Sequence, residues 1–179
     1  LWVDTWYDDT FALALASARP QGDWVQIQGL SQSEHFGRWT GCYADDGEYL
    51  AELPQDPGRV LYRPIGGRSP AGNYLVSDSD YVEVLTEIDI QTPIPTVVQS
   101  YRSGRSFLFL GCRFDDQLTR SFARQIMKRS SAQHWAVLPH EPTRMEARFL
   151  EEQGIQRIAM ELPAFAPLLV EALQPALAA

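Results

Sequence analysis

Apolar runs alternate with helical periodicity along the second half of the chain. The run Ser106 to Gly111 is continuous and ends in Gly, which is typical of a strand covered on both faces of a parallel sheet. Alternation of strands and helices at this spacing predicts right-handed crossovers and parallel pairing. The expected order is strand 106–111, a helix beginning at Asp115 or Asp116, strand 134–138, helix 143–153, strand 155–160 and helix 163–178.

Residues at the expected helix ends agree with this order. A carboxylate at Asp115 or Asp116 accepts the unpaired N–H groups of a first helical turn. Thr143 and Glu146 have the spacing of a capping box, and Gly154 stands where a helix would end. After Asp116, the residues at helical spacing that would face the sheet are Leu118, Phe122, Ile126 and Met127.

The first half of the chain has a weaker pattern. Residues 1–3 read as a strand, 4–9 as a turn and 10–18 as a helix. The stretch 20–73 holds many of the glycines and prolines, so a loop-rich excursion is expected there, with short strands at 24–28 and 59–62. Helices are expected at 81–87 and 96–101. The fold class is therefore α/β: a Rossmann-like parallel sheet with flanking helices.

Composition narrows the class of protein. A chain of 179 residues with 45% apolar residues can bury one core, so we expect a single domain over 1–179. The net charge of -8 would repel a phosphate backbone, which excludes nucleic acid as an expected partner. No apolar stretch is long enough to span a bilayer, so a cytoplasmic protein without membrane contact is expected. Cys42 and Cys112 form neither a disulfide pattern nor a metal motif, and no metal site is expected.

Several segments, in this order, resemble the sirtuin-like family of NAD-binding domains, particularly its NAD-hydrolase branch. The motif Thr-Trp-Tyr-Asp-Asp is similar to the Thr-Asn-Tyr-Asp turn of active members, and Arg-Pro-Ile-Gly to their Lys-Leu-His-Gly. The Gly-ended strand followed by an Asp-started helix is a third match. The segments that carry the resemblance are 5–9, 60–67, 79–81, 107–116, 134–138 and 149–155.

The resemblance also assigns positions. The Asn that helps to hold the ribose and the attacking water is replaced by Trp6, whose indole only donates. The family His falls at Ile65 or its neighbour Pro64, neither of which can move a proton. The Gly-rich phosphate turn would precede Leu1 and is not in the chain.

The resemblance with these replacements predicts a non-catalytic protein, without a cofactor, that works by binding a protein partner as an accessory or assembly factor. An accessory factor of nitrogenase, of the nitrogenase-associated factor T type, is one form that the resemblance implies. Aromatic side chains are the residues that anchor protein interfaces. The expected interface residues are Trp6, Phe36, Trp39 and Tyr43.

The alternative is an NAD-binding or NAD-hydrolysing enzyme. The resemblance then assigns cofactor binding to Asp8, Gly111 and Asp116. The other candidate groups favour structural roles: the acidic pairs read as helix caps or loops, and His35 as a surface residue. The loop 66–72 lacks the Gly-Lys-Ser/Thr ending of a phosphate loop.

Overall fold

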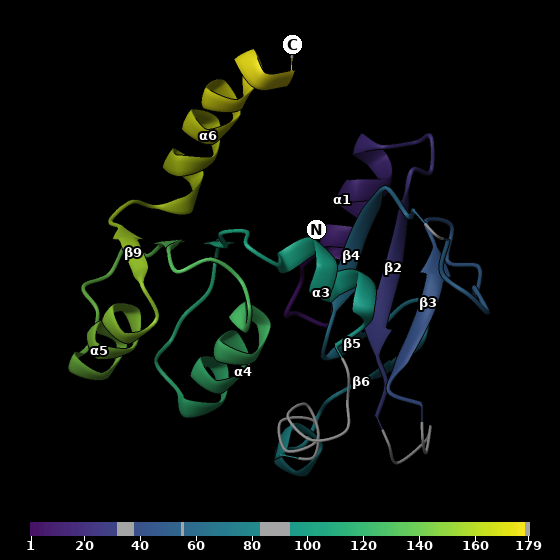
Figure 1. Cartoon of the computed structure of the whole chain (residues 1–179), viewed down its shortest axis with the longest axis horizontal. Coiled ribbons are helices and arrows are strands. Elements are labelled where there is room, and N and C mark those ends of the chain that lie inside the picture. The colour runs from purple at the N-terminus through teal and green to yellow at the C-terminus, as the bar shows by residue number, and fades with distance from the viewer. Residues whose placement is uncertain (32–37, 55, 83–93, 178–179) are drawn as a thin grey trace. The chain divides into compact units, whose positions relative to one another are not determined.

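The computed structural model describes residues 1–31, 38–54, 56–82 and 94–177. Within them the chain forms two compact units, Leu1–Tyr101 and Arg102–Ala179 (Figure 1). Each unit has its own sheet and its own hydrophobic core, and each is described by itself. A single domain over 1–179 stays a prediction.

The N-terminal unit contains a four-stranded sheet of order β1-β4-β2-β3. Strand β4 pairs in parallel with both β1 and β2, as predicted for the fold class, whereas the edge strand β3 is antiparallel to β2. The stretch 20–73 is loop-rich, and it also supplies three strands of this sheet, one of which (β3) the sequence pattern did not reveal. The strands are β1 (Trp2–Val3), β2 (Trp24–Gly29), β3 (Thr40–Ala44) and β4 (Arg59–Arg63).

Side chains alternate along β2 and β4, and both faces of this sheet are covered. One face holds Val25, Ile27, Val60 and Tyr62, which pack with Val98 of helix α3 (Thr96–Arg102). The opposite face holds Trp24 and Leu61, which pack with Leu15 of helix α1 (Thr10–Ala18). Because strand side chains alternate, Gln26, Gln28 and Arg63 point to the same face as α1. This register places polar groups next to the turn that precedes α1.

A short hairpin follows β4 in the same unit. Its strands are β5 (Gly66–Gly67) and β6 (Asn73–Tyr74), paired antiparallel. Gly66 has φ of 83°, and a Cβ there would lie 2.3 Å from the Asn73 carbonyl oxygen. The chain then enters helical residues at 78–82, and the rest of the helix predicted at 81–87 lies outside the described residues.

The C-terminal unit contains a three-stranded parallel sheet of order β7-β8-β9. Its core is formed by Phe114, Ala136, Leu138 and Phe149 with their neighbours. Each predicted strand and helix of this half is present, close to its expected bounds. The elements are β7 (Leu108–Phe109), α4 (Gln117–Met127), β8 (His134–Val137), α5 (Arg144–Glu152), β9 (Ile155–Ile158) and α6 (Leu162–Leu177).

The helix ends are those that the sequence indicates. Asp116 caps α4, accepting a hydrogen bond from the Thr119 N–H, and Thr143 and Glu146 form the complete capping box of α5. Strand β7 is shorter than predicted, and Leu108 and Leu110 are exposed, so the expected cover on both faces is not found. Because strand side chains alternate, Phe107 and Phe109 pack on the core of this unit, whereas Leu108 and Leu110 share the opposite, exposed face.

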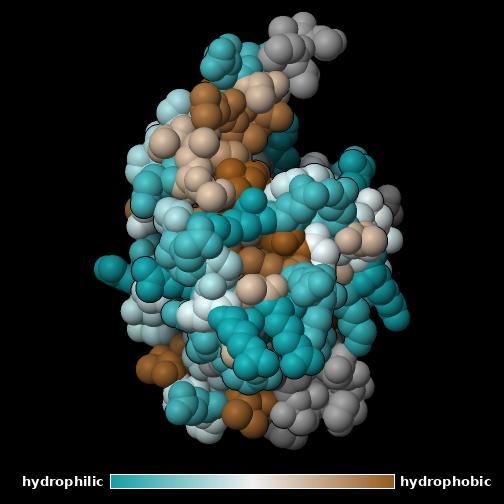
Figure 2. Space-filling model, turned by 90° about the vertical axis from the view of Figure 1, so that its left-hand side faces the viewer, coloured by the Kyte–Doolittle hydropathy of each residue, from teal (hydrophilic) through white to brown (hydrophobic). Residues whose placement is uncertain are grey.

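Helix α6 is the most apolar surface element of the C-terminal unit. Leu168, Val170 and Leu173 are exposed on it, and Glu171 is its one charged side chain. Figure 2 shows this hydrophobic surface at the top of the view. Within the described residues, no helix is both long and apolar enough to cross a membrane.

Candidate functional site

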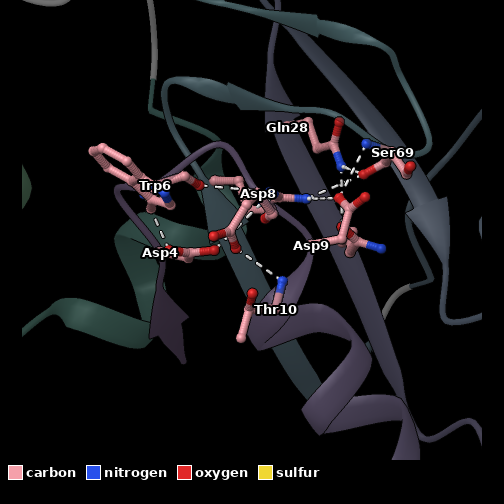
Figure 3. A network of polar contacts seen from close by, with 9 residues as sticks. Asp4, Trp6, Asp8, Asp9, Thr10, Gln28 and Ser69 are labelled. Atoms are coloured by element: carbon pink, nitrogen blue, oxygen red, sulfur yellow. Dashed lines mark hydrogen bonds and ion pairs between the residues drawn. The ribbon is translucent and has the colours of Figure 1, made fainter.

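The turn between β1 and α1, residues 4–9, carries the segment that resembles the family's Thr-Asn-Tyr-Asp motif. Two of its carboxylates hold the backbone of the turn itself. Asp4 Oδ1 accepts the Trp6 N–H at 3.1 Å, and Asp8 Oδ1 accepts the Thr10 N–H at 2.8 Å (Figure 3). The Asp8 bond satisfies a donor at the start of α1 that no helical carbonyl can reach.

A buried arginine holds the turn against the sheet. Arg63, the last residue of β4, is fully buried, and its guanidinium donates to the carbonyl oxygens of Asp8 and, at 3.5 Å, Trp6. It also pairs with two carboxylates, at 3.6 Å from Asp4 Oδ2 and 3.4 Å from Asp9 Oδ1. A planar group with five donors can serve these four acceptors at once, whereas a lysine ammonium has only three donors.

The hairpin after β4 completes the enclosure of this guanidinium. Arg63 Nη1 donates to the Ser69 carbonyl at 3.1 Å, while the Ser69 N–H donates to Asp9 Oδ1 at 3.1 Å. A Cβ on Gly67 would lie 2.4 Å from Arg63 Nη1, so only glycine leaves room for the arginine there. The Gly-rich loop that follows β4 therefore packs on a protein cation.

Gln28 of β2 borders the same enclosure. Its Nε2 donates to the Ser69 carbonyl at 2.6 Å and to Gln26 Oε1 at 3.0 Å. Within the described part of the chain, its Oε1 is buried and accepts no hydrogen bond. Figure 3 shows Gln28, Ser69 and Asp9 converging from three separate segments of the N-terminal unit.

Two of the three carboxylates of the turn, Asp8 and Asp4, have opposite pKa shifts. The Thr10 N–H, as the main cause, lowers the pKa of Asp8, and the side chains of Thr10, Arg63 and Trp6 add to the lowering. Burial raises the pKa of Asp4, and the negative charge of Asp8 contributes to that rise. Asp8 is therefore ionised at neutral pH.

Three aromatic rings are stacked beside the turn. Trp6 and Tyr7 have ring centroids 4.9 Å apart, and Tyr7 stacks on Tyr74 of β6 at 5.1 Å with an interplanar angle of 11°. Trp6 is 58% exposed and Tyr7 is 39% exposed. Offset stacks of this spacing are the favourable arrangement for aromatic rings. We call these three residues the aromatic column.

Two of the other aromatic residues predicted for an interface, Trp39 and Tyr43, lie elsewhere in the same unit. Trp39 is half-buried just before β3. Tyr43 is buried in β3, with its ring edge against Tyr49. Phe36 lies outside the described residues. Their role in an interface stays a prediction.

Ile65, which with its neighbour Pro64 is where the resemblance places the family's His, lies inside the N-terminal unit. Its side chain is buried, and its carbonyl oxygen accepts the Leu75 N–H at 2.9 Å. An alkyl side chain has no proton to give or take, so this position supplies no general acid or base.

Two of the three residues predicted for a cofactor belong to the C-terminal unit. Gly111 follows β7 with φ of 67°, and apart from Leu162 Cδ2 at 4.0 Å the space beside it is open. The Asp116 carboxylate is engaged at the start of α4, accepting the Thr119 N–H at 2.7 Å and the Thr119 hydroxyl. Asp8 belongs to the N-terminal unit, so a shared site for the three stays a prediction.

The histidines that the structure describes have structural partners. His134 Nδ1 accepts the Phe107 N–H at 2.9 Å, and His140 Nε2 lies 3.2 Å from Glu146 Oε1. Burial lowers the pKa of His134. In residues 1–31, 38–54, 56–82 and 94–177, no group of three or more His, Cys, Asp or Glu side chains could hold a metal ion.

A family model for the SIR2-like domain matches residues 1–158, which is most of the chain. The protein belongs to the SIR2-like family. Neither a curated protein nor a solved structure matches the chain. The match includes the turn, Arg63 and the start of α4, and it ends before α6 begins. The family resemblance drawn from the sequence is thereby confirmed, whereas a nitrogenase-associated type stays a prediction.

Sequence reasoning missed Arg63, Gly67 and Tyr74. The sequence carried a signal for Arg63 and Gly67. Arg63 ends an apolar strand and precedes Pro-Ile-Gly-Gly, and an arginine in that place needs buried acceptors and a small neighbour. No local signal could identify Tyr74, because its partner Tyr7 lies in a distant segment of the chain.

Proposed function

We propose that this chain is a non-catalytic SIR2-like protein that binds a protein partner, as an accessory or assembly factor of a larger complex. The observation that carries the proposal is the exposed indole of Trp6. It stands at the position where active members have the Asn that orients water, and it is stacked on Tyr7. Exposed tryptophan and tyrosine side chains held in a fixed geometry are the usual anchors of protein interfaces.

The way the turn is held supports binding. Arg63 and the Asp4, Asp8 and Asp9 carboxylates fix the backbone from which Trp6 and Tyr7 project. Side chains presented on a fixed backbone lose less conformational entropy when a partner binds. Buried Ile65 supports the non-catalytic part of the proposal, because it offers no group for proton transfer.

A nitrogenase complex is one candidate partner, named by the family resemblance alone. It is tested by mixing the purified chain with purified nitrogenase component proteins and following co-elution on size exclusion. Co-elution that Trp6→Ala abolishes supports this partner, and separate elution rejects it.

The general proposal has two tests. Purified protein is first incubated with NAD, and nicotinamide and ADP-ribose are followed by chromatography. We expect no turnover. Turnover that is lost in Asp8→Asn would reject the non-catalytic assignment.

The second test is partner capture from the native lysate, identified by mass spectrometry. We expect Trp6→Ala to lose specific partners that wild type retains. Tyr49→Ala is the matched control, because Tyr49 is also an exposed aromatic residue of the N-terminal unit but pairs with β3, at the other end of the sheet from β1. Equal capture by Trp6→Ala and wild type would contradict an interface at the aromatic column.

Binding of NAD without turnover is a second candidate, favoured by Gly111. It lies at the carboxyl end of a parallel strand, before a helix capped by Asp116, and this edge is where open α/β sheets bind ligands. Isothermal titration with NAD tests it. Heat of binding that is lost in Gly111→Val and kept in Gly104→Val supports this candidate, since Gly104 has the same φ of 67° and open surroundings. The absence of heat in wild type rejects it.

A further inference from the structure

The outer face of the exposed Trp6 indole is the face that points away from Tyr7. Tyr7 stacks on one face of the indole, and among the described residues no other ring and no guanidinium is recorded over the opposite face. Figure 3 shows the ring projecting away from the polar network that holds the turn. An aromatic face of this kind carries the negative side of the ring quadrupole.

Negative charges outnumber positive ones at the turn. It carries the carboxylates of Asp4, Asp8 and Asp9, and the cation paired with two of them, Arg63, is fully buried. The exposed residue Arg68 adjoins the turn, since its N–H donates to the Tyr7 carbonyl at 2.8 Å, so three carboxylates face two cations. The charge of Asp8 adds to the rise in the pKa of Asp4 that burial causes.

We propose that the Trp6 face and the Asp8 carboxylate bind an arginine side chain of the protein partner. This inference rests on the proposed protein-binding function and names the chemistry of that partner. A guanidinium stacks flat on an indole and at the same time donates to a carboxylate, which a compact ammonium does less well. Attraction to a basic segment also agrees with the net charge of -8 of the whole chain.

Other ligand chemistries fit this surface less well. An anion would face the carboxylates of the turn, and buried Arg63 has no exposed surface to receive it. A purely apolar side chain would gain from the indole but would add no cation beside Asp8, whose carboxylate is ionised. The combination of an open ring face and an ionised carboxylate is complementary to a planar cation.

The probe is a fluorescein-labelled peptide, Gly-Ser-Arg repeated three times, titrated with full-length protein and followed by anisotropy at low salt. The matched peptide has citrulline in place of each arginine, which keeps the shape and removes the charge. A cation stacked on an exposed ring contributes about 0.5–1 kcal/mol, equivalent to about 2–5-fold in Kd per contact. We expect the arginine peptide to bind more tightly than the citrulline peptide by at least that factor.

Two variants locate the binding. Trp6→Ala and Asp8→Asn should each weaken binding of the arginine peptide about 2–5-fold while the citrulline peptide is unaffected. Asp46→Asn is the matched control for charge, because Asp46 also accepts the N–H two residues along, at 2.9 Å, but in the loop after β3. In Asp8→Asn and Asp46→Asn, the asparagine keeps the Oδ1 atom that accepts the backbone N–H. A difference in Kd between these two variants therefore does not come from loss of the turn.

Equal Kd values for the two peptides would overturn the inference. Equal weakening of arginine-peptide binding by Asp8→Asn and Asp46→Asn would also overturn it, because that result indicates diffuse attraction to an acidic chain. If the peptides bind equally and Trp6→Ala still abolishes partner capture, the arginine assignment is wrong while the protein-binding function stands. If the arginine peptide binds as expected but partner capture is unchanged in Trp6→Ala, the function fails on its own test.

Discussion

Replacing Arg63 by Met is the most informative perturbation of the turn. Methionine keeps most of the length and the apolar stem, but it removes every donor and the charge. The change leaves the Asp8, Trp6 and Ser69 carbonyls without this donor and two carboxylates without their cation. Removing one partner of a buried ion pair costs about 3–5 kcal/mol, because the remaining charge is left uncompensated.

The structure favours the lower end of that range. The side chains of Asp4 and Asp9 are 15% and 20% exposed, so water relieves part of their unpaired charge. We expect a loss of about 3 kcal/mol in the free energy of unfolding of the N-terminal unit. For a unit of the size of Leu1–Tyr101, that corresponds to a fall of about 12–24 °C in Tm.

The assay is urea unfolding combined with hydrogen-exchange mass spectrometry of peptides covering residues 1–18. The peptides report the N-terminal unit alone, which is necessary because the chain forms two compact units. Arg59→Met is the matched control, since it lies on the same strand and pairs with Asp23, but both side chains are about 40% exposed (43% and 39%). An exposed pair contributes under about 1 kcal/mol. If Arg63→Met costs no more than Arg59→Met, the anchoring role assigned to Arg63 is wrong.

Three further changes test the C-terminal unit. Burial lowers the pKa of His134, so the unfolded chain binds more protons near pH 6 and wild type should lose stability as pH falls through about 6.5. In urea titrations from pH 8 to 5.5, His134→Gln should lose less stability than wild type. Parallel curves for the two proteins would show that His134 is not the origin of the pH dependence. Thr143→Ala should cost about 0.5–2 kcal/mol by removing the cap of α5, and Thr143→Ser should restore most of it in the same titration. Gly154→Ala should lower Tm more than Gly104→Ala. Both glycines have positive φ, but only at Gly154 would a Cβ meet a backbone atom, the Ala132 carbonyl oxygen at 2.3 Å. Equal shifts in Tm would contradict this reason.

Much of the C-terminal unit could be predicted because its signals are local. A capping box at Thr143 and Glu146, a glycine after α5 and apolar residues at helical spacing after Asp116 each depend on neighbours within one or two turns. The extent of β7 could not be predicted in this way, because its pairing and exposure depend on which strands lie beside it.

The candidate site could likewise be predicted only in part from the sequence. The resemblance of residues 5–9 and 60–67 to family motifs predicts that Trp6, Asp8 and Ile65 stand at functional positions, and the SIR2-like match over 1–158 confirms the family. The sequence alone thus determined the family and the fold class, whereas the replacement of the catalytic residues stays a prediction.

Only the tertiary structure decided how the turn is held and what it exposes. Arg63 reaches the Asp8 carbonyl across 55 positions of sequence, and Tyr7 stacks on Tyr74 through the β5-β6 hairpin. Such contacts depend on strand order and register, which bring distant segments together and leave no periodicity in either one. The physical reason is that local spacing encodes a helix or a strand, whereas the surroundings of a buried charge are set by the folded chain as a whole.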